Sequence, residues 1–520
     1  MAKAPVQAFS QPNVIVKNRG LLTAGIMVAV VMQVLDTTIA NVALPHMRAS
    51  LGASQDEINW VLTSYIVASA IATPLTGWFA DRFGRKNLLL GAVIGFTVAS
   101  LLCGVASSLE QMVLFRVVQG ICGAVLVPLA QATIMDINPR ERLGQAMAVF
   151  GAGIMIGPII GPTLGGWLTE TFNWRAVFLV NLPVGALAFF ILFFLMPKSV
   201  IKLRRFDFFG FGMLALAVAC LQLLLDRGQQ ADWFKSAEIW IYLGLAISGS
   251  WAFIIHCATA QDPFIDLGMF KDRNFASGLV FIFVIGITMF SGLALLPPML
   301  QNLMGFPVIE TGVVMAPRGV GTMLSMIIVG RLVSKYDPRM LVLVGILLTA
   351  WSLYMMTQFD IVMGTGPIMI SGALQGMGLG LVFVPLSTLA FATINPKYRV
   401  DATSMFSLVR NVGSGVGISI VTSVLANMQV VNHAELAERV TLDAGPIRDF
   451  ATSHGGFNST VINTLNGLIT QQSAMISFLD DFWLMMLVSL VSIPIVFVLR
   501  RPPRHQAKPS PAEQAHAMAE

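Results

Sequence analysis

The sequence predicts an all-α polytopic membrane protein with fourteen transmembrane helices and both termini in the cytoplasm. Three observations predict it: the composition, the number of long apolar stretches and the placement of basic residues. Of the 520 residues, 56% are hydrophobic and 11% are charged, whereas soluble domains have about 45–50% and about 25%. So little charge cannot cover water-facing surfaces, and we therefore expect lipid to surround most of the chain.

The apolar stretches have the length of membrane-spanning helices. A helix of about 20 apolar residues crosses the hydrocarbon core. Continuous apolarity favours helices over barrel strands, which would alternate and be about half as long. The fourteen predicted spans cover residues 21–45, 60–80, 88–108, 111–136, 143–168, 176–197, 208–225, 238–258, 275–300, 308–332, 340–358, 366–393, 401–427 and 478–499.

Lys and Arg residues are unevenly divided between the two sides of these spans. With the N-terminus inside, most of the basic residues in the connections are cytoplasmic. The outside receives only Arg48, Arg175, Arg227, Lys235, Arg439 and Arg448. Because cytoplasmic loops are enriched in Lys and Arg, this bias places both termini in the cytoplasm. It also explains the net charge of +5 as topology, and we expect no nucleic-acid binding.

Several function classes lack support in the sequence. No G-x-x-x-x-G-K-[ST] segment indicates ATP-driven pumping, and no soluble domain or metal-ligand cluster indicates an enzyme. We expect no catalytic residues, no metal and no cofactor. The cysteines lie in apolar stretches without metal or disulfide spacing, and we interpret them as small packing residues: Cys103, Cys122, Cys220 and Cys257.

One connection, residues 428–477, is long and polar and falls on the predicted outer face. A loop of this length is usually functional or disordered. Its later part, around Val461, Ile462 and Leu465, has helix-like spacing. A folded element that contacts a partner or gates the protein, and a tolerated insertion, both stay open.

An internal repeat divides the chain. Residues 118–142 match residues 374–399, and residues 77–86 match residues 330–339 more weakly. Both copies lie on the cytoplasmic side in the same helix order, so the halves are parallel repeats. The predicted domains, in chain order, are an N-terminal six-helix bundle (1–200), a two-helix insertion (201–272), a C-terminal six-helix bundle that includes 428–477 (273–500) and a cytoplasmic tail expected to be disordered (501–520).

The segment "GWFADRFGRK" (77–86) forms the short cytoplasmic turn after the second span. Gly77 permits close helix approach, Asp81 can accept hydrogen bonds, and the basic residues anchor the turn, as in any cytoplasmic loop. The spacing of Gly77, Asp81, Arg82, Gly84, Arg85 and Lys86 resembles the signature of the major facilitator superfamily. The resemblance implies that Asp81 and Arg85 belong to a charge network that locks the cytoplasmic gate in the outward-open state.

Two charged residues lie inside predicted spans. Asp36 sits in "QVLDTTIANVALP" (33–45), and Arg116 opens "RVVQGICGA". A carboxylate at mid-bilayer costs about 2.5–3.5 kcal/mol on insertion scales, and such residues usually serve a function. The first segment resembles a motif of the fourteen-span drug:proton antiporters (the EmrB/QacA group), and the second resembles a superfamily motif whose arginine is linked to proton transfer. Plain packing roles, through interhelical or backbone hydrogen bonds, stay open for both.

The segment "GIMIGPIIGPTLGG" (153–166) in the fifth span has small residues at regular spacing. Small residues let helices approach closely, so packing alone is one interpretation. The segment also resembles the antiporter motif that marks exporters within the superfamily. The matching residues are Gly157, Pro158, Gly161, Pro162, Gly165 and Gly166.

Other intramembrane polar residues are candidates for the wall of a substrate cavity, although interhelical hydrogen bonds would also explain them. They are Gln33, Thr37, Gln301, Arg318, Gln375, Arg410 and Asn411.

The resemblance to EmrB-type permeases, which covers nearly the whole chain, implies a proton-coupled antiporter in a bacterial inner membrane. It would export hydrophobic and amphipathic drugs with the proton gradient as its energy source. A periplasmic adaptor and an outer-membrane channel are implied as partners. The alternatives are an exporter of one metabolite, such as a fatty acid or a siderophore, and a non-transporting receptor or structural subunit.

Overall fold

The computed structural model describes residues 14, 16, 18–139, 142–198, 201, 204–333, 335–440, 445–453, 456 and 458–499. Within these ranges the chain is helical and has no strand. Fourteen helices are long and apolar enough to cross a membrane. The predicted all-α polytopic fold and its fourteen spans are thereby confirmed. The predicted tail (501–520) lies outside the described residues, and the division into bundles and insertion stays a prediction.

The crossings are built as follows: α1 (Arg19–Leu51); α3 (Trp60–Ala72), η1 (Thr73–Leu75) and α4 (Thr76–Phe83); α5 (Arg85–Val105); α6 (Leu109–Ala124) and α7 (Leu126–Ile137); α8 (Leu143–Thr171); α9 (Ala176–Leu179) and α10 (Asn181–Leu195); α11 (Phe208–Arg227); α12 (Ala237–Thr259); α13 (Arg273–Pro298) and η5 (Met299–Leu303); α14 (Val308–Leu332); α15 (Pro338–Met356); α16 (Thr365–Ala392); α17 (Arg399–Arg439); α19 (Ser459–Val491) and α20 (Ile493–Val498). The short helices α2 (Gln55–Ile58), η3 (Trp233–Lys235), η4 (Leu267–Lys271), η6 (Pro396–Tyr398) and α18 (Gly445–Ser453) lie in connections.

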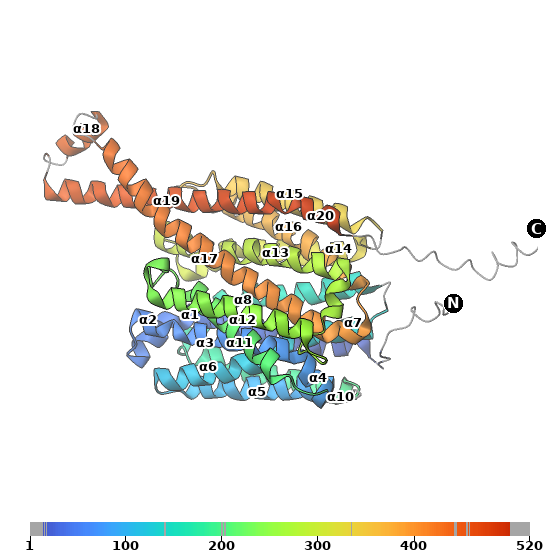
Figure 1. Ribbon diagram of the computed structural model, residues 1–520. Coiled ribbons are helices and arrows are strands. Elements are labelled where there is room, and N and C mark those ends of the chain that lie inside the picture. The colour runs from blue at the N-terminus through green and yellow to red at the C-terminus, as the bar shows by residue number, and fades with distance from the viewer. Residues whose placement is uncertain are drawn as a thin grey trace, which may run out of the picture.

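The even number of crossings brings the start of α1 and the end of α20 to one end of the bundle, opposite α18 (Figure 1). We call these the inner and the outer end, following the predicted orientation. At the inner end, α4 stops at Gly84, whose φ of 78° is strained for any residue with a side chain. This glycine allows α5 to start at once in a new direction.

The buried apolar residues divide differently at the two ends. One large cluster joins the two repeated halves and includes Ile134 of the first half and Phe406 of the second. Toward the outer end, a cluster around Met47 belongs to the first half and a separate cluster around Phe359 belongs to the second. The halves are therefore packed together at the inner end and have separate cores at the outer end.

Helix α8 lies between α1 of its own half and α14 of the other half, and its small-residue face packs on α1. A methyl group on Gly157 would lie 3.0 Å from the backbone nitrogen of Leu35, and one on Gly165 would lie 3.3 Å from Cα of Ile39. Gly161 faces the side chain of Thr38. These glycines allow α1 to pass close to α8, as the packing interpretation expects.

The polar connection 428–477 is largely helical. Helix α17 continues to Arg439 and α19 begins at Ser459, so the two form a hairpin that projects beyond the bundle with α18 at its tip (Figure 1). Asn432 on α17 donates to the hydroxyl of Ser477 (3.0 Å) and to Asp480 (3.2 Å) on α19. We call residues 428–477 the outer arm. Its described residues are folded, while a role in contacting a partner or in gating stays a prediction.

Asp207 ties together the two additional helices, α11 and α12, and the segment that follows α12. Its carboxylate accepts hydrogen bonds from the backbone N–H groups of Gly210 (2.8 Å) and Phe264 (2.9 Å), and Nε2 of His256 lies 2.9 Å away. Partial burial would by itself raise the pKa of Asp207, but these hydrogen bonds hold it below its usual value. Asp207 is therefore an anionic anchor at neutral pH.

Asp481 on α19 is a buried carboxylate without a hydrogen-bond partner among the described residues. Its side chain is 0% exposed, and neither oxygen has a hydrogen-bond partner among the described residues, whereas the adjacent Asp480 bonds Asn432. A buried polar group without a partner costs about 1–3 kcal/mol. We expect Asp481→Val, close in volume, to raise the midpoint of thermal unfolding in detergent.

The matched control for this change is Asp480→Val, which removes the hydrogen bond to Asn432 and should not stabilise the protein. A lower midpoint for Asp481→Val than for the unmodified chain would show that the carboxylate has a stabilising partner.

Candidate central cavity and gate

A cavity of about 450 Å³ lies between the two halves. Both halves and α11 contribute to its wall, which reaches Gln229 just beyond the outer end of α11. Most of the wall is apolar, with residues such as Ile154, Met155, Phe290 and Phe383. A cavity of this size and character suits a drug-sized, largely apolar molecule.

The structure separates the seven predicted cavity residues into two groups. Gln33, Thr37, Arg410 and Asn411 line the cavity. The other three are not among the described residues that line it: Gln301 lies in η5, Gln375 is buried, and Arg318 is buried and donates to the carbonyl of Met289 (2.9 Å).

Helix α11 supplies cavity residues that sequence reasoning missed. Gln222, Leu225 and Asp226 all line the cavity, and the carboxylate of Asp226 accepts a hydrogen bond from the hydroxyl of Thr63 on α3. The sequence feature that could have revealed this was Asp226 itself, a charged residue just before the end of an apolar span. Among the described lining residues, Asp226 and Arg410 are the two charged groups.

Asp36 and Arg116 form a buried ion pair beside the cavity. Nη1 of Arg116 lies 2.6 Å from Oδ2 of Asp36, and their side chains are 0% and 1% exposed. Oδ1 of Asp36 accepts from Gln119 (2.9 Å) and from Asn181 (2.7 Å). The pair is thus enclosed by α1, α6 and α10, and Asp36 does not line the cavity although its neighbours Gln33 and Thr37 do.

Tyr65 separates this ion pair from the cavity. Its ring lies over the guanidinium of Arg116, with 4.2 Å between ring centroid and Cζ. Its hydroxyl accepts a hydrogen bond from Nε2 of Gln33 (3.3 Å). Tyr65 and Gln33 both line the cavity. A molecule in the cavity can therefore touch Tyr65, which contacts Arg116 directly, and Gln33, which is hydrogen-bonded to Tyr65.

A second charge cluster closes the inner end. The carboxylate of Asp136, at the end of α7, binds Arg85 at the start of α5 through one oxygen and Arg399 at the start of α17 through the other. Arg399 and Asp136 are 8% and 6% exposed. We call these three residues the inner latch. Because Arg399 belongs to the second half, the inner latch ties the halves together.

Arg85 of the inner latch belongs to segment 77–86, and the other residues of this segment make contacts of their own. Gly77 lies directly against the side chain of Asp401 on α17, and Asp81 lies near enough to Asp401 for like-charge repulsion. Lys86 donates to the carbonyl of Phe193 (2.7 Å), and Arg82 is exposed.

The resemblance implied that Asp81 and Arg85 share a network. In the described part of the chain Arg85 binds Asp136, and no ion pair of Asp81 is present there. Sequence reasoning missed Asp136 and Arg399. The available signal was that both lie near the ends of the two repeat copies.

Comparisons with known proteins agree with this architecture. The family model of the Major Facilitator Superfamily matches residues 26–418. The chain belongs to the major facilitator superfamily. It is a multi-pass membrane transporter rather than an enzyme. The protein lies in the lipid bilayer, and its substrates are small molecules.

Relatives of this superfamily chain match over nearly their whole length. It is 34% identical to the fatty acid resistance protein FarB of Neisseria gonorrhoeae, over 93% of this chain and 96% of FarB. It is 33% identical to the multidrug export protein EmrB of Escherichia coli (strain K12), over 93% of this chain and 95% of EmrB. These similarities confirm the predicted resemblance to EmrB-type permeases.

The crystal structure of the human organic anion transporter MFSD10 (TETRAN) has the same fold. The TM-score is 0.58 at 14% identity, over 91% of this chain and 99% of that one.

Proposed function

We propose that this superfamily member is a proton-coupled antiporter that exports hydrophobic and amphipathic compounds across the bacterial inner membrane. The central cavity would hold the cargo, and the proton gradient would supply the energy without a cofactor. The names of EmrB, a multidrug export protein, and FarB, a fatty acid resistance protein, support export of toxic apolar compounds.

The observation that carries the proposal is the contact from the cavity through Tyr65 to Arg116. Protonation of Asp36 would neutralise the carboxylate and weaken its pairing with Arg116. Arg116 would then shift together with Tyr65 and Gln33, and these two side chains would move into the cavity and displace the cargo. Loss of the proton would restore the ion pair, because a buried carboxylate without a cation is costly, and would reopen the cavity for cargo. Cargo and proton would thus exclude each other without sharing one chamber.

The remaining step is the change that exposes the cavity to one side of the membrane and then to the other. The halves share a common apolar core at the inner end, where the inner latch joins α5 and α7 to α17, and have separate cores at the outer end. In this conformation the cavity reaches toward the outer end. Breaking the inner latch and closing the outer end would turn the cavity toward the cytoplasm for loading.

We further propose that the protein acts with a periplasmic adaptor and an outer-membrane channel. The support is its similarity to EmrB together with the outer arm, which extends beyond the bundle on the predicted periplasmic side (Figure 1).

One observation favours a second cargo class. Arg410 is a cation in the cavity wall, and its Nε has no hydrogen-bond partner among the described residues. An amphipathic carboxylate could bind there with its chain along the apolar wall, and the name of FarB agrees with that. Export of a fatty-acid anion is therefore the alternative.

The test is transport by the full chain in sealed vesicles with an imposed proton gradient and an internal pH dye. Ethidium and laurate, in separate arms, distinguish the two cargo classes. We expect cargo-dependent proton movement with the unmodified chain. Asp36→Asn should abolish gradient-driven transport, because the amide keeps the shape of Asp36 but cannot exchange a proton.

Thr37→Ser is the control, since it changes a cavity residue on the same helix but leaves Asp36 intact. Full active transport by Asp36→Asn would remove Asp36 from the coupling step. Absence of cargo-dependent proton movement by the unmodified chain, with every cargo tried, would favour the receptor alternative.

A further inference from the structure

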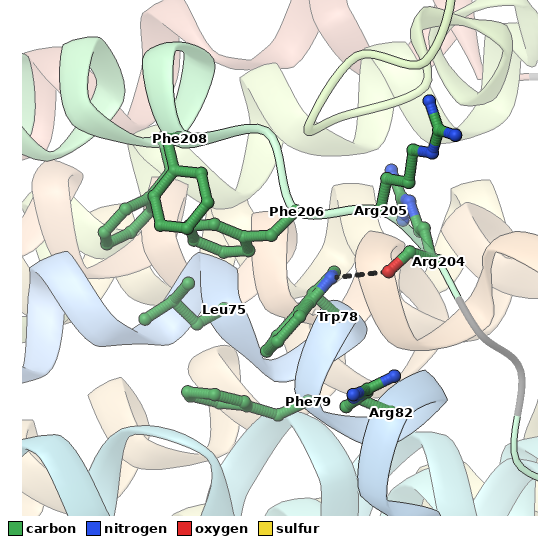
Figure 2. A pocket seen from close by; sticks show the side chains of 9 residues that line it. Leu75, Trp78, Phe79, Arg82, Arg204, Arg205, Phe206 and Phe208 are labelled. Atoms are coloured by element: carbon green, nitrogen blue, oxygen red, sulfur yellow. Dashed lines mark hydrogen bonds between the residues drawn. The ribbon is translucent and has the colours of Figure 1, made fainter.

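A second pocket, of about 560 Å³, lies at the inner end, apart from the central cavity. One wall consists of Leu75, Trp78 and Phe79 from η1 and α4 (Figure 2). The other consists of Phe206, which precedes α11, and Phe208 and Phe211 from the first turn of α11. It shares no described lining residue with the central cavity.

The walls of this pocket are aromatic and partly open to the surroundings. The ring of Phe206 packs edge-on against Trp78 and Phe208, with centroid distances of 4.8 and 4.7 Å. The side chain of Phe208 is 80% exposed. The pocket lies at the end of two membrane-spanning helices, where aromatic rings typically mark the boundary between hydrocarbon and headgroups. An apolar ligand from the bilayer can therefore reach it.

Three arginines also line the pocket, and one of them is structural. The guanidinium of Arg204 donates to the carbonyls of Pro263 (2.9 Å) and Phe264 (2.7 Å) and lies 3.5 Å from Asp401. Its own carbonyl accepts a hydrogen bond from Nε1 of Trp78 (3.2 Å; Figure 2).

The other two arginines, Arg82 and Arg205, are exposed and have no ion-pair or hydrogen-bond partner among the described residues. Figure 2 shows Arg82 on the α4 side of the pocket and Arg205 on the opposite segment, with Trp78 between them. Two guanidinium groups without counter-charge thus border an apolar pocket.

We propose that this pocket binds an anionic phospholipid of the cytoplasmic leaflet. Its phosphate would contact Arg82, and the exposed side chain of Arg205, whose guanidinium points away from Trp78 in Figure 2, would turn toward the same phosphate. Guanidinium groups form strong charge-assisted hydrogen bonds with phosphate. An acyl chain would lie on the aromatic walls. Basic pockets between transmembrane helices on the cytoplasmic side bind such headgroups. A zwitterionic lipid would fit less well, because its headgroup adds a cation beside two arginines. A free phosphate would also fit less well, because it leaves the apolar walls uncovered.

The occupied pocket stabilises the conformation in which the inner end is closed. Trp78 on α4 donates a hydrogen bond to the carbonyl of Arg204, and the guanidinium of Arg204 lies beside Asp401 on α17. The side chain of Asp401 in turn packs against Gly77 on α4. This wall keeps its shape only while α4 and α17 remain in contact. A ligand that binds one of two conformations better shifts the equilibrium toward it.

The test uses Trp78 as the reporter. The full chain is placed in phosphatidylcholine nanodiscs that contain increasing fractions of brominated phosphatidylglycerol, and tryptophan quenching is measured. The difference between the unmodified chain and Trp78→Phe isolates Trp78. We expect brominated phosphatidylglycerol to quench Trp78 at fractions where brominated phosphatidylcholine does not. Arg205→Gln should raise the required fraction about tenfold, the effect of losing one charge-assisted hydrogen bond.

Two variants control this measurement. Arg205→Lys keeps the charge and should restore most of the quenching. Arg273→Gln removes an exposed arginine of the same end outside the pocket and should change nothing. Equal quenching by phosphatidylcholine, no effect of an Arg82→Gln/Arg205→Gln double variant, or relief of quenching by soluble glycerol 3-phosphate would each overturn the lipid assignment.

Discussion

Arg116→Leu is expected to be the most destabilising single substitution at the coupling site. It leaves the carboxylate of Asp36 buried among Gln119, Asn181 and apolar side chains without a cation. Removing one partner of a buried ion pair typically costs about 3–5 kcal/mol, because the remaining charge is uncompensated. The free energy of unfolding, measured by titrating micelles with a denaturing detergent, should fall by this amount.

The double variant Asp36→Asn/Arg116→Leu separates lost charge balance from lost packing. It removes both charges and should recover a large part of the stability that Arg116→Leu loses. Arg116→Lys, which keeps a cation in place, should be less harmful than Arg116→Leu. Equal losses in Arg116→Leu and in the double variant would show that Arg116 stabilises through its contacts with Val61 and Tyr65 instead.

Arg399→Gln should open the inner end. Arg399 supplies the inner-latch contact that crosses between the halves, and it is nearly fully buried with Asp136. Losing one partner of such a pair removes about 3–5 kcal/mol from the inner-closed conformation. The equilibrium should shift toward the inner-open conformation by at least about 100-fold. Labelling of Thr73→Cys, a residue of the cavity wall, by a thiol reagent added from the cytoplasmic side reports this shift.

Arg85→Gln is the matched control, since Arg85 binds the same carboxylate from within the first half. It should increase labelling less than Arg399→Gln does, and Arg399→Lys should keep labelling near the unmodified level. If Arg85→Gln and Arg399→Gln labelled equally, the cross-half contact would have no special part in closure.

The fold could be predicted from the sequence because lipid imposes a simple rule. Every span must be long, apolar and helical, and all fourteen could be found by that rule. This rule could not identify the helices of the outer arm. These helices are polar on several sides, so α17 beyond Met428 and α19 before Phe478 have no continuous apolarity to mark them as helix.

The site was only partly predictable, for a reason visible on α1. At 3.6 residues per turn, Thr37 lies about 40° from Gln33 on one side and Asp36 about 60° from it on the other, so Asp36 and Thr37 are about 100° apart. In the structure Gln33 and Thr37 face the cavity, whereas Asp36 faces α6 and α10. Because all three share one broad helix face, their spacing alone could not show that Asp36 points away from the cavity.

Contacts between distant segments were beyond the sequence for another reason. Asp136 and Arg399 are ordinary charged residues at span ends, and only the packing of α17 on the first half brings them together. The contribution of α11 to the cavity likewise depends on how the additional pair of helices packs against α3 and α17.

The unbroken length of α17 mechanically connects the two faces of the membrane. This single helix begins at Arg399 and ends at Arg439, a rod of about 60 Å at 1.5 Å per residue. Each degree of tilt about its cytoplasmic foot displaces its far tip by about 1 Å. If α17 tilts as a rigid rod when the inner latch opens, its outer tip moves with it, and a neighbouring protein bound to that tip would detect the transport cycle as motion.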